Sequence, residues 1–150
     1  MPMDLENIRQ LFRQLVPFVT KVGIEIDEVA DHHVKLRFPR DPSNFNHVGS
    51  YHAGALFTFA ETSAAAGLAM ALDLSRYRIV VKHGEIAYRR AVYDEITCSV
   101  DIRPEQLTEA TAVVEREGRG TVPVTVQFLD RDGQVCTEAT MTFHLKRLGP

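Results

Sequence analysis

The sequence has no tryptophan and only two cysteines among its 150 residues. Cys98 and Cys136 are too few for a disulfide framework, which favours a reduced, cytoplasmic compartment. The opening segment, MPMDLENIRQ, is acidic and amphipathic and lacks the apolar core that a secretory signal needs. Repeats and low-complexity tracts are also missing, so residues 1–150 are expected to form a single domain.

Positive charge is not in excess either, because the net charge is −3 with 25% of the residues charged. The chain therefore lacks the broad positive field that attracts nucleic acid or an anionic membrane. One apolar run, residues 53–72, is long enough to cross a bilayer, but Glu61 lies in its middle and the run has no flanking positive charge or aromatic belt. We expect a buried helix there, and neither nucleic acid nor a membrane as a partner.

Alternation of apolar and polar residues predicts six strands, which we expect to be antiparallel. They lie within residues 22–26, 34–38, 77–90, 96–103, 122–128 and 135–145. Asp132-Gly133 between the last two is a turn signal, so residues 121–146 are predicted to form a long hairpin. In the third strand the apolar parity changes near Gly84, as a β-bulge would cause.

Helical spacing of apolar residues predicts a short amphipathic helix after Asp4. Residues 104–118 are predicted to be helical too, with a proline in the first turn and Gly118 as the stop. The run 53–72 is apolar nearly all round, so its helix must be covered on most sides. The predicted fold class is α+β, an antiparallel sheet of about six strands wrapped around one long central helix, plus the short N-terminal helix.

The candidate site begins where the polar loop 39–51 leads into the central helix. The first N–H groups of a helix lack intrahelical partners and carry the positive end of its dipole. Ala53 and Gly54 therefore offer donors for a developing oxyanion, and the loop delivers His52 to the helix start. Asn46, within the loop, could position a water molecule or the acid.

Glu61 is the one carboxylate in the apolar run, and it could supply a base or a nucleophile with a pKa raised by its surroundings. Ala53 and Glu61 are eight residues apart, which is about 12 Å along a helix axis. One side chain cannot bridge that distance. An antiparallel copy of the helix, related by a two-fold axis, would place its Glu61 beside this helix start. The mechanism therefore predicts an obligate homodimer with two equivalent sites.

Each site residue also has an ordinary interpretation. A glutamate on a helix is most often solvated, a lone histidine before a helix is most often a cap, and an asparagine in a loop is most often a turn residue. Lys82, Arg89 and Arg90 could form a phosphate-binding patch or could simply be solvated. Phe57 could line an acyl pocket or could pack in the core.

Metal and thiol chemistry have little support in the sequence. His47 and His52 show no tight ligand spacing with each other or with Glu61, so no metal is expected. Cys98 falls on the apolar face of its strand and Cys136 on the polar side of its own. Neither cysteine lies in a known nucleophile pattern, so both are expected to be bystanders.

Residues 46–61, NHVGSYHAGALFTFAE, resemble the N-x-x-G-x-x-H-G-G-A-L-F…D/E signature of hot-dog-fold acyl-CoA thioesterases of the PaaI type. The later strand ends in Tyr88, Arg90 and Ala91, where such proteins often have Tyr-x-Arg-Pro-Ala. The resemblance covers roughly residues 20–147. It implies a hot-dog fold, with a helix wrapped in an antiparallel sheet, and hydrolysis of an acyl-CoA thioester.

The resemblance also implies roles for individual residues. Glu61 would take the acid position as base or nucleophile, the Ala53 N–H would make the oxyanion contact, and Asn46 and His52 would support them. It implies a homodimer that contributes the acid across its interface and that often pairs again into a dimer of dimers. The partner would be an acyl-CoA, with no cofactor beyond the CoA carried by the substrate.

The chain departs from the family pattern at three positions, of which Ala91, in place of the usual proline, mainly affects strand geometry. Ala53 replaces the first glycine of the pair, which keeps the N–H but narrows the approach. Val81 stands where many relatives carry a serine or threonine that holds the water, unless Thr58, Thr62 or Ser63 substitutes. Val81 motivates a competing hypothesis, a hot-dog protein that binds acyl-CoA or a fatty acyl group without hydrolysing it. A hydratase of the same fold ranks lower, because its His–acid pair follows another local pattern.

Overall fold

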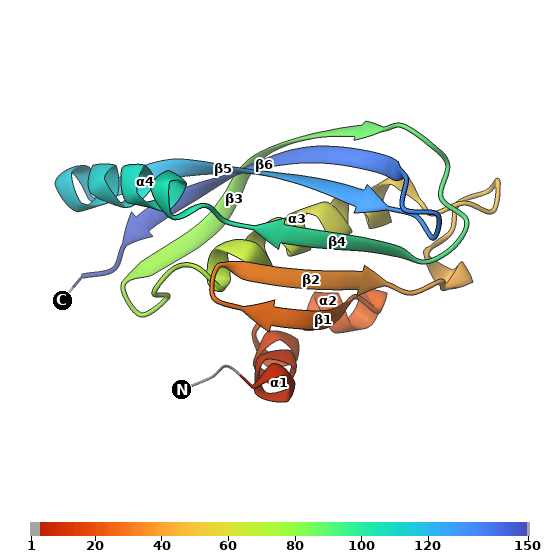
Figure 1. The fold of residues 1–150 in the computed structure, drawn as a ribbon, viewed down its shortest axis with the longest axis horizontal. Helices are drawn as coiled ribbons and strands as arrows, with labels where there is room; N and C mark the ends of the chain where they lie inside the picture. The colour runs from red at the N-terminus through yellow and green to blue at the C-terminus, as the bar shows by residue number, and fades with distance from the viewer. Residues whose placement is uncertain (1–3, 150) are drawn as a thin grey trace.

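One antiparallel sheet curves around the long helix α3 (Ala53–Ala69) in the computed structural model, which describes residues 4–149 (Figure 1). The strands are β1 (Glu25–Ala30), β2 (His33–Phe38), β3 (Tyr77–Tyr88), β4 (Ile96–Asp101), β5 (Arg119–Leu129) and β6 (Val135–Arg147). They lie in the order β1-β2-β4-β5-β6-β3. The other helices are α1 (Leu5–Leu15), α2 (Pro17–Val22), α4 (Pro104–Glu117) and the 3₁₀ helix η1 (Pro42–Asn44). The predicted α+β class, with its six strands around a central helix, is confirmed.

Helix α1 forms where the sequence predicted it and protects the β1 edge of the sheet. The Asp4 side chain caps the helix by accepting a hydrogen bond from the Glu6 N–H at 3.1 Å. Arg9 Nε then donates to the Ile26 carbonyl of β1 at 2.8 Å. An edge carbonyl that would otherwise be open to another strand is thus occupied by a side chain.

Helix α2 corrects the predicted start of the first strand. Pro17 opens this short helix, and Gly23 ends it in the left-handed conformation with φ 86°. Val22, which was predicted to begin a strand, is instead the last helical residue, and β1 starts at Glu25. The alternation of Val22, Ile24 and Ile26 was therefore only partly a strand signal.

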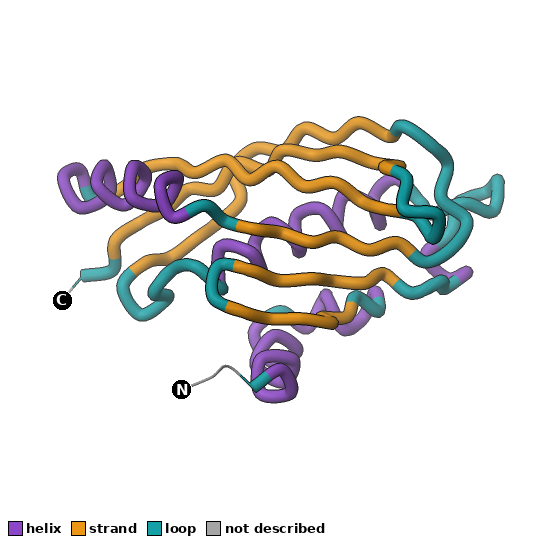
Figure 2. Tube along the Cα trace, viewed as in Figure 1, coloured by secondary structure: helices purple, strands orange, loops and turns teal. Residues whose placement is uncertain are grey.

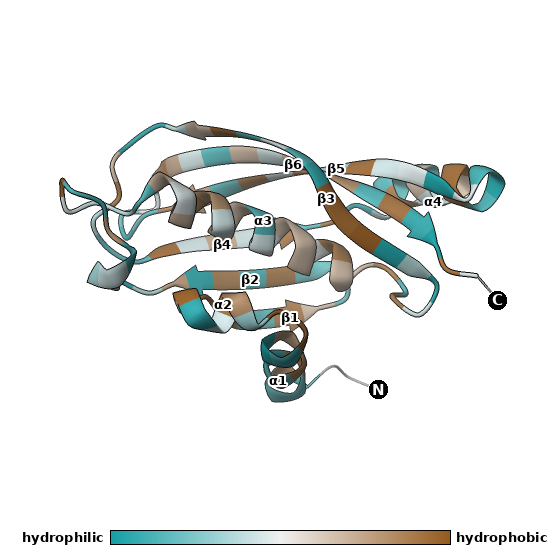
Figure 3. Cartoon of the chain, turned by 180° about the vertical axis from the view of Figure 1, so that it is seen from behind, coloured by the Kyte–Doolittle hydropathy of each residue, from teal (hydrophilic) through white to brown (hydrophobic). Residues whose placement is uncertain are grey.

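Helix α3 packs on the concave face of the sheet. Phe59 is fully buried against the strands, and a Cβ placed on Gly67 would lie 2.5 Å from Val100 Cγ1. The helix ends at Ala69, earlier than the apolar run suggested. Seen from behind, α3 lies in front of the sheet with its outer side toward the viewer (Figure 3). The sheet therefore covers one side of this apolar helix and leaves the opposite side open in the single chain.

Strand β3 contains the predicted bulge, displaced by two residues. Its register against β6 shifts between Val81 and His83, so Lys82 is the extra residue. Gly84 has a different role, because a Cβ there would lie 2.8 Å from Phe57 Cζ and 2.7 Å from Met141 Sδ. The missing side chain makes room for the Phe57 ring to pack against the strand.

The β5–β6 hairpin and helix α4 form as predicted. In the hairpin turn the Asp130 carboxylate accepts from the N–H groups of Asp132 and Gln134, each at 2.9 Å. Strand β5 pairs with β4 at a single position near its end. Helix α4 lies beside the other half of β5, where the Gln106 side-chain amide donates to the Pro123 carbonyl. A strand edge with a proline is thus covered by a helix.

Both cysteines are buried, which corrects the prediction for one of them. Cys98 lies in the core, and its burial raises the pKa of the thiol to about 12. Cys136, predicted on the polar side, is also buried and donates to the Phe128 carbonyl at 3.4 Å. No helix within residues 4–149 is long and apolar enough to cross a membrane.

Candidate active site

Two loops meet at the N-terminal end of helix α3. The loop between β2 and α3 and the loop between β3 and β4 lie at the same end of the sheet (Figure 2). The Tyr51 N–H donates to the Val92 carbonyl at 2.8 Å and joins them. The Tyr51 side chain is buried in the core, and this burial holds the junction of the two loops in place. The start of α3 is therefore held between two backbone segments.

His52 is the N-cap of α3. Its Nδ1 accepts a hydrogen bond from the Gly54 N–H at 2.9 Å. The cap occupies one of the two N–H groups that the sequence offered as oxyanion donors. Gly54 is thus engaged with His52, and the N–H of Ala53 is the remaining donor.

The peptide between Ala53 and Gly54 is held from both ends. The Tyr88 hydroxyl, at the end of β3, donates to the Ala53 carbonyl at 3.0 Å, while the Gly54 N–H is bound by the cap. The Ala53 N–H meets no acceptor within residues 4–149. It lies at the positive end of the α3 dipole and is oriented for an external acceptor. Tyr88 was not predicted as a site residue, although its place in the Tyr-x-Arg pattern was noted.

Asn46 builds the loop that faces this helix start. Its Oδ1 accepts from the Val48 N–H at 3.0 Å and from the Ser50 N–H at 3.2 Å, and its Nδ2 donates to Ser50 Oγ at 3.0 Å. The side chain thus closes a tight turn in which Gly49 takes φ 77°. Within this chain Asn46 acts as a turn residue that shapes the wall of the site.

A cavity of about 240 Å³ opens between these elements. It is lined by Asn46, Ser50, Tyr51, Ala53, Leu56, Tyr88, Arg89, Arg90, Ala91 and Val92. Four of the residues singled out in the sequence therefore meet here: Asn46, Ala53, Arg89 and Arg90. Five others, His52, Gly54, Phe57, Glu61 and Lys82, do not line it. The cavity offers one free backbone donor, a tyrosine hydroxyl and two cationic side chains.

The two arginines of the cavity differ in their partners. Arg89 donates through Nε at 3.2 Å and Nη2 at 3.1 Å to one carboxylate oxygen of Glu138. Arg90 is anchored by its backbone N–H, which donates to the Cys136 carbonyl at 3.0 Å. Its guanidinium meets no carboxylate in the described chain. Arg90 is thus the cation available to an anionic ligand.

Lys82 lies away from both arginines. It lines a separate groove with Arg119, Thr121 and His144, on the other side of the β3 bulge. The predicted patch of Lys82, Arg89 and Arg90 is therefore not one surface. Alternation along the strand does not predict this separation, because the bulge at Lys82 changes which way the following residues point.

Glu61 lies on the open side of α3. It shares a helical strip with Gly54, Thr58 and Ala65, whose spacing places them on one face. The side chain is half-buried, and burial raises the pKa of its carboxyl above the ordinary value. No ion pair or hydrogen bond involves this carboxylate within residues 4–149. It lies about 12 Å along the axis from Ala53, so a single chain does not bring the acid to the donor.

The hydroxyls that could replace a water-holding residue are placed differently. Thr62 and Ser63 are buried on the sheet side of α3. Thr58 alone shares the strip of Glu61, and its Oγ1 donates to the Gly54 carbonyl at 2.9 Å. Val81 is half-buried on the concave face of β3. No group of three or more His, Cys, Asp or Glu suited to a metal ion occurs in the described part of the chain.

A family model described as a domain of unknown function, DUF4442, matches residues 6–145 of this chain. No curated protein shows a significant match. Among solved structures, the chain is similar to PA5026 of Pseudomonas aeruginosa, a protein of unknown function described as a probable thioesterase. The TM-score is 0.88 with 28% sequence identity, and the match covers 99% of each chain.

Two further solved structures share the fold at lower identity. Thioesterase HI1161 of Haemophilus influenzae superposes with a TM-score of 0.78 and 19% identity, over 100% of this chain and 95% of that one. A point mutant of thioesterase PA1618 of Pseudomonas aeruginosa gives a TM-score of 0.78 and 19% identity, over 99% and 97% of the two chains. These likenesses establish the hot-dog-like fold.

Proposed function

Because this chain belongs to the DUF4442 family and has a thioesterase-like fold, we propose that it is a thioesterase that hydrolyses acyl-CoA. One observation carries the proposal. The described chain contains a backbone donor without an acceptor, at Ala53, and a half-buried carboxylate without a partner, at Glu61. The two are complementary halves of a hydrolytic site, and they lie on the same helix, too far apart to act together.

A second copy of the chain would join the two halves. Strand β3 is the last strand of the sheet, so one of its edges is unpaired within the described chain. Beside it lies the open strip of α3, where Gly54, Thr58 and Ala65 are small and Glu61 is the one charge. Pairing β3 with β3 of a second copy around a two-fold axis would bring the two α3 strips together in antiparallel fashion. Each Glu61 would then approach the other copy's Ala53.

The reaction follows from this arrangement. The thioester carbonyl oxygen accepts a hydrogen bond from the Ala53 N–H, which stabilises the negative charge that develops on it. Glu61 of the second protomer takes a proton from water as the water attacks the carbonyl carbon, or attacks that carbon itself to form an anhydride that water then opens. The C–S bond breaks, the thiolate leaves and is protonated, and the free acid forms. A raised carboxyl pKa strengthens Glu61 as a base at neutral pH.

The cationic wall of the cavity suits the CoA end of the substrate. Arg90 has no carboxylate partner within residues 4–149 and lines the same cavity as the oxyanion donor, so it is the side chain that we assign to an anionic group of the substrate. Arg89 is engaged with Glu138 and shapes the rim. Phe57, packed on Gly84 next to the open strip, would contact the acyl group.

The test is a thiol-release assay with a panel of acyl-CoAs. The purified protein is compared with Glu61→Gln and with a matched control, Glu109→Gln, which removes an exposed carboxylate of α4. We expect Glu61→Gln to lower kcat on the order of a hundredfold or more, with Glu109→Gln unchanged. Equal rates for all three proteins would refute the proposal.

A non-catalytic acyl-CoA-binding protein is the second candidate, and Val81 is the observation that favours it. No hydroxyl from β3 reaches the open strip at this position, which leaves Thr58 to hold a water. Calorimetric titration with a non-hydrolysable acyl-CoA thioether separates the two functions. Binding of the thioether together with no thiol release from any acyl-CoA selects the binding protein.

A further inference from the structure

Three cations lie side by side on the convex face of the sheet, the face turned away from α3. In the strand register Arg119 of β5 is opposite Lys146 of β6, and Lys146 is opposite Arg78 of β3. All three side chains are exposed, and they alternate with inward residues such as the fully buried Leu145. Like charges directly opposite one another destabilise a sheet, so this row costs stability.

The row has no internal counter-charge. None of Arg78, Arg119 and Lys146 makes an ion pair or a side-chain hydrogen bond within residues 4–149. Water and salt weaken the repulsion between these cations but do not remove it at Cβ separations of about 5 Å. A bound anion would offset the repulsion that remains.

A groove adjoins the row and adds a fourth cation. Lys82, the bulge residue of β3, lines a groove of about 450 Å³. The groove is lined by Lys82, Val113, Glu117, Arg119, Gly120, Thr121 and His144. Its volume lies in the range of small-molecule clefts. Thr121 offers a hydroxyl and Val113 an apolar contact, so the groove can take more than a bare ion.

Glu117 is the one carboxylate that lines the groove, and it lies 3.4 Å from Arg116 of its own helix. The end of α4 also points its negative dipole this way, and Arg119 and Lys82 offset that dipole. Offsetting the helix dipole does not explain Arg78 and Lys146, because they lie on β3 and β6. Four cations against Glu117 give this corner a charge of +3, in a chain whose net charge is −3.

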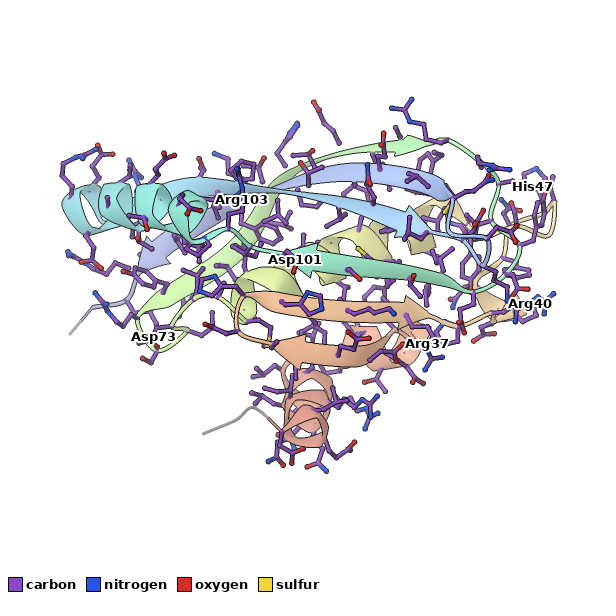
Figure 4. The ribbon with its side chains drawn as sticks, in the orientation of Figure 1. Arg37, Arg40, His47, Asp73, Asp101 and Arg103 are labelled. Atoms are coloured by element: carbon purple, nitrogen blue, oxygen red, sulfur yellow. The ribbon has the colours of Figure 1, made fainter. Side chains whose placement is uncertain are left out.

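The other half of the sheet shows that the same fold pairs its cations. Arg37 of β2 contacts Asp27 and Glu25, each at 3.0 Å, and Glu95 at 3.5 Å. His33 on the same strand lies 2.7 Å from Asp101 of β4. Figure 4 labels Arg37 and Asp101 on the face turned to the viewer. The cations on the outer face of β2 are therefore paired, whereas the three that lie opposite one another on β5, β6 and β3 are not, within residues 4–149.

We propose that this corner, comprising Arg78, Lys82, Arg119 and Lys146, is a second ligand site that binds an organic polyphosphate. Cations spaced by one strand, about 4.8 Å apart, match successive phosphate groups, and the groove has room for the organic part. The corner lies on the opposite face of the sheet from the cavity at Ala53. Lys82 is about 20 Å along β3 from Tyr88, at six residues and 3.3 Å per residue. The site is therefore distinct from the proposed active site of the same chain.

The experiment is a calorimetric titration of the full-length protein with ADP, with CoA and with inorganic pyrophosphate at low salt. We expect saturable binding that weakens as salt rises. Lys146→Gln, which removes the central cation, should weaken binding about tenfold, the effect of losing one charge-assisted contact. Arg131→Gln is the matched control, because it removes one exposed cation from the turn of the same hairpin. It should change the dissociation constant less than about twofold.

The arms separate the sources of the phosphate. Binding of ADP and CoA with equal affinity identifies a free nucleotide as a sufficient ligand, and binding of CoA alone identifies the nucleotide end of the proposed substrate. Binding of ADP and binding of CoA both depend on Lys146 if the proposal is right.

The proposal is overturned if no polyphosphate binds the wild type, or if Lys146→Gln binds as tightly as the wild type. Because Lys146→Gln relieves repulsion, its thermal midpoint without ligand should not fall, which excludes unfolding as the cause of weak binding. Thiol release by Glu61→Gln is independent of these results.

Discussion

The two sides of the sheet are built differently. On the β1 side, the edge strand has six residues and carries an irregularity between Ile26 and Glu28, and its Ile26 carbonyl accepts a hydrogen bond from Arg9 of α1. On the β3 side, the edge strand has twelve residues and no helix of the described chain covers its free edge, while Val80 is exposed and Val81 half-buried. Long uncovered edges invite pairing with another chain, and short protected edges prevent it.

Charge follows the same division. The cations of β2 are each flanked by carboxylates, whereas on the β3 side Arg78, Lys146 and the carboxylate of Glu61 have no ion-pair partner within residues 4–149. The β1 side is therefore complete within one chain. The β3 side leaves backbone groups, an acid and several cations for other molecules, and both the proposed active site and the proposed polyphosphate site lie there.

The largest expected effect comes from placing a charge on each edge. Val81→Lys puts an inward-pointing charge on β3 and should convert the proposed homodimer to a monomer, lowering thioesterase activity on the order of a hundredfold or more, because Glu61 and Ala53 no longer meet. Val29→Lys makes the same change on β1, where we expect no change of mass and activity within about threefold. Light scattering and the thiol assay measure both. The same mass for both variants would remove the distinction between the edges.

The second effect concerns the packing of β3 against α3. Gly84→Ala adds a Cβ that would lie 2.8 Å from Phe57 Cζ, so we expect a loss of about 1–3 kcal/mol of unfolding free energy by chemical denaturation. Gly149→Ala is the control, because a Cβ there meets nothing within 4 Å. Adding Phe57→Leu to Gly84→Ala should restore part of the loss. If Gly84→Ala proves neutral, the ring is not held as described.

The third effect compares a paired cation with an unpaired one. Arg37→Gln should destabilise the fold by about 1–2 kcal/mol, because three carboxylates lose a shared partner. Lys146→Gln should leave stability unchanged or raise it by up to about 0.5 kcal/mol, since it removes a positive charge that lies opposite two other positive charges. Urea unfolding of both variants at low salt makes the comparison. Equal losses would show that the two surfaces are electrostatically alike.

The smallest effect is the pH dependence of Glu61. Burial raises the pKa of this carboxyl in the folded chain, so the folded state binds its proton more tightly than the unfolded state. The tighter proton binding stabilises the folded state at pH values below the ordinary glutamate pKa. This stabilisation is lost as the pH rises through the raised pKa of the folded state. Glu61→Gln should therefore have the same stability as the wild type at low pH and a higher stability than the wild type above that pH window. The gain should be under about 1 kcal/mol, since a half-exposed carboxylate keeps much of its hydration. Thermal unfolding from pH 4 to 8 measures it, and a gain that is independent of pH would contradict the assignment.

Local patterns predicted most of the elements and part of the site. Alternation found the strands that bury one face, and Pro104 with Gly118 marked the ends of α4 correctly, because these signals act over a few residues. Ala53 and Asn46 were found at the same cavity because the loop–helix junction is local in sequence. The short helix α2 was missed, since six residues carry too little periodicity to outweigh an alternating Val-x-Ile-x-Ile pattern.

Contacts between distant segments escaped sequence reasoning. Tyr88 reaches the Ala53 carbonyl from thirty-five residues away, and nothing near either residue signals that bond. Cys136 was expected on the polar side but lies beneath the Arg89–Arg90 backbone, whose N–H groups donate to its carbonyl. A one-residue bulge separated Lys82 from the arginines, because each inserted residue reverses the side to which a strand's side chains point.

By itself, the sequence determined which residues are apolar, where the turns and caps fall and that one acid sits in an apolar helix, because these follow from side-chain chemistry over short spacings. Only the tertiary structure decided which side of that helix is covered, which N–H at its start remains free and which cations stand unpaired. Those outcomes depend on strand order and register, which bring together residues far apart in the chain, and no short pattern encodes them.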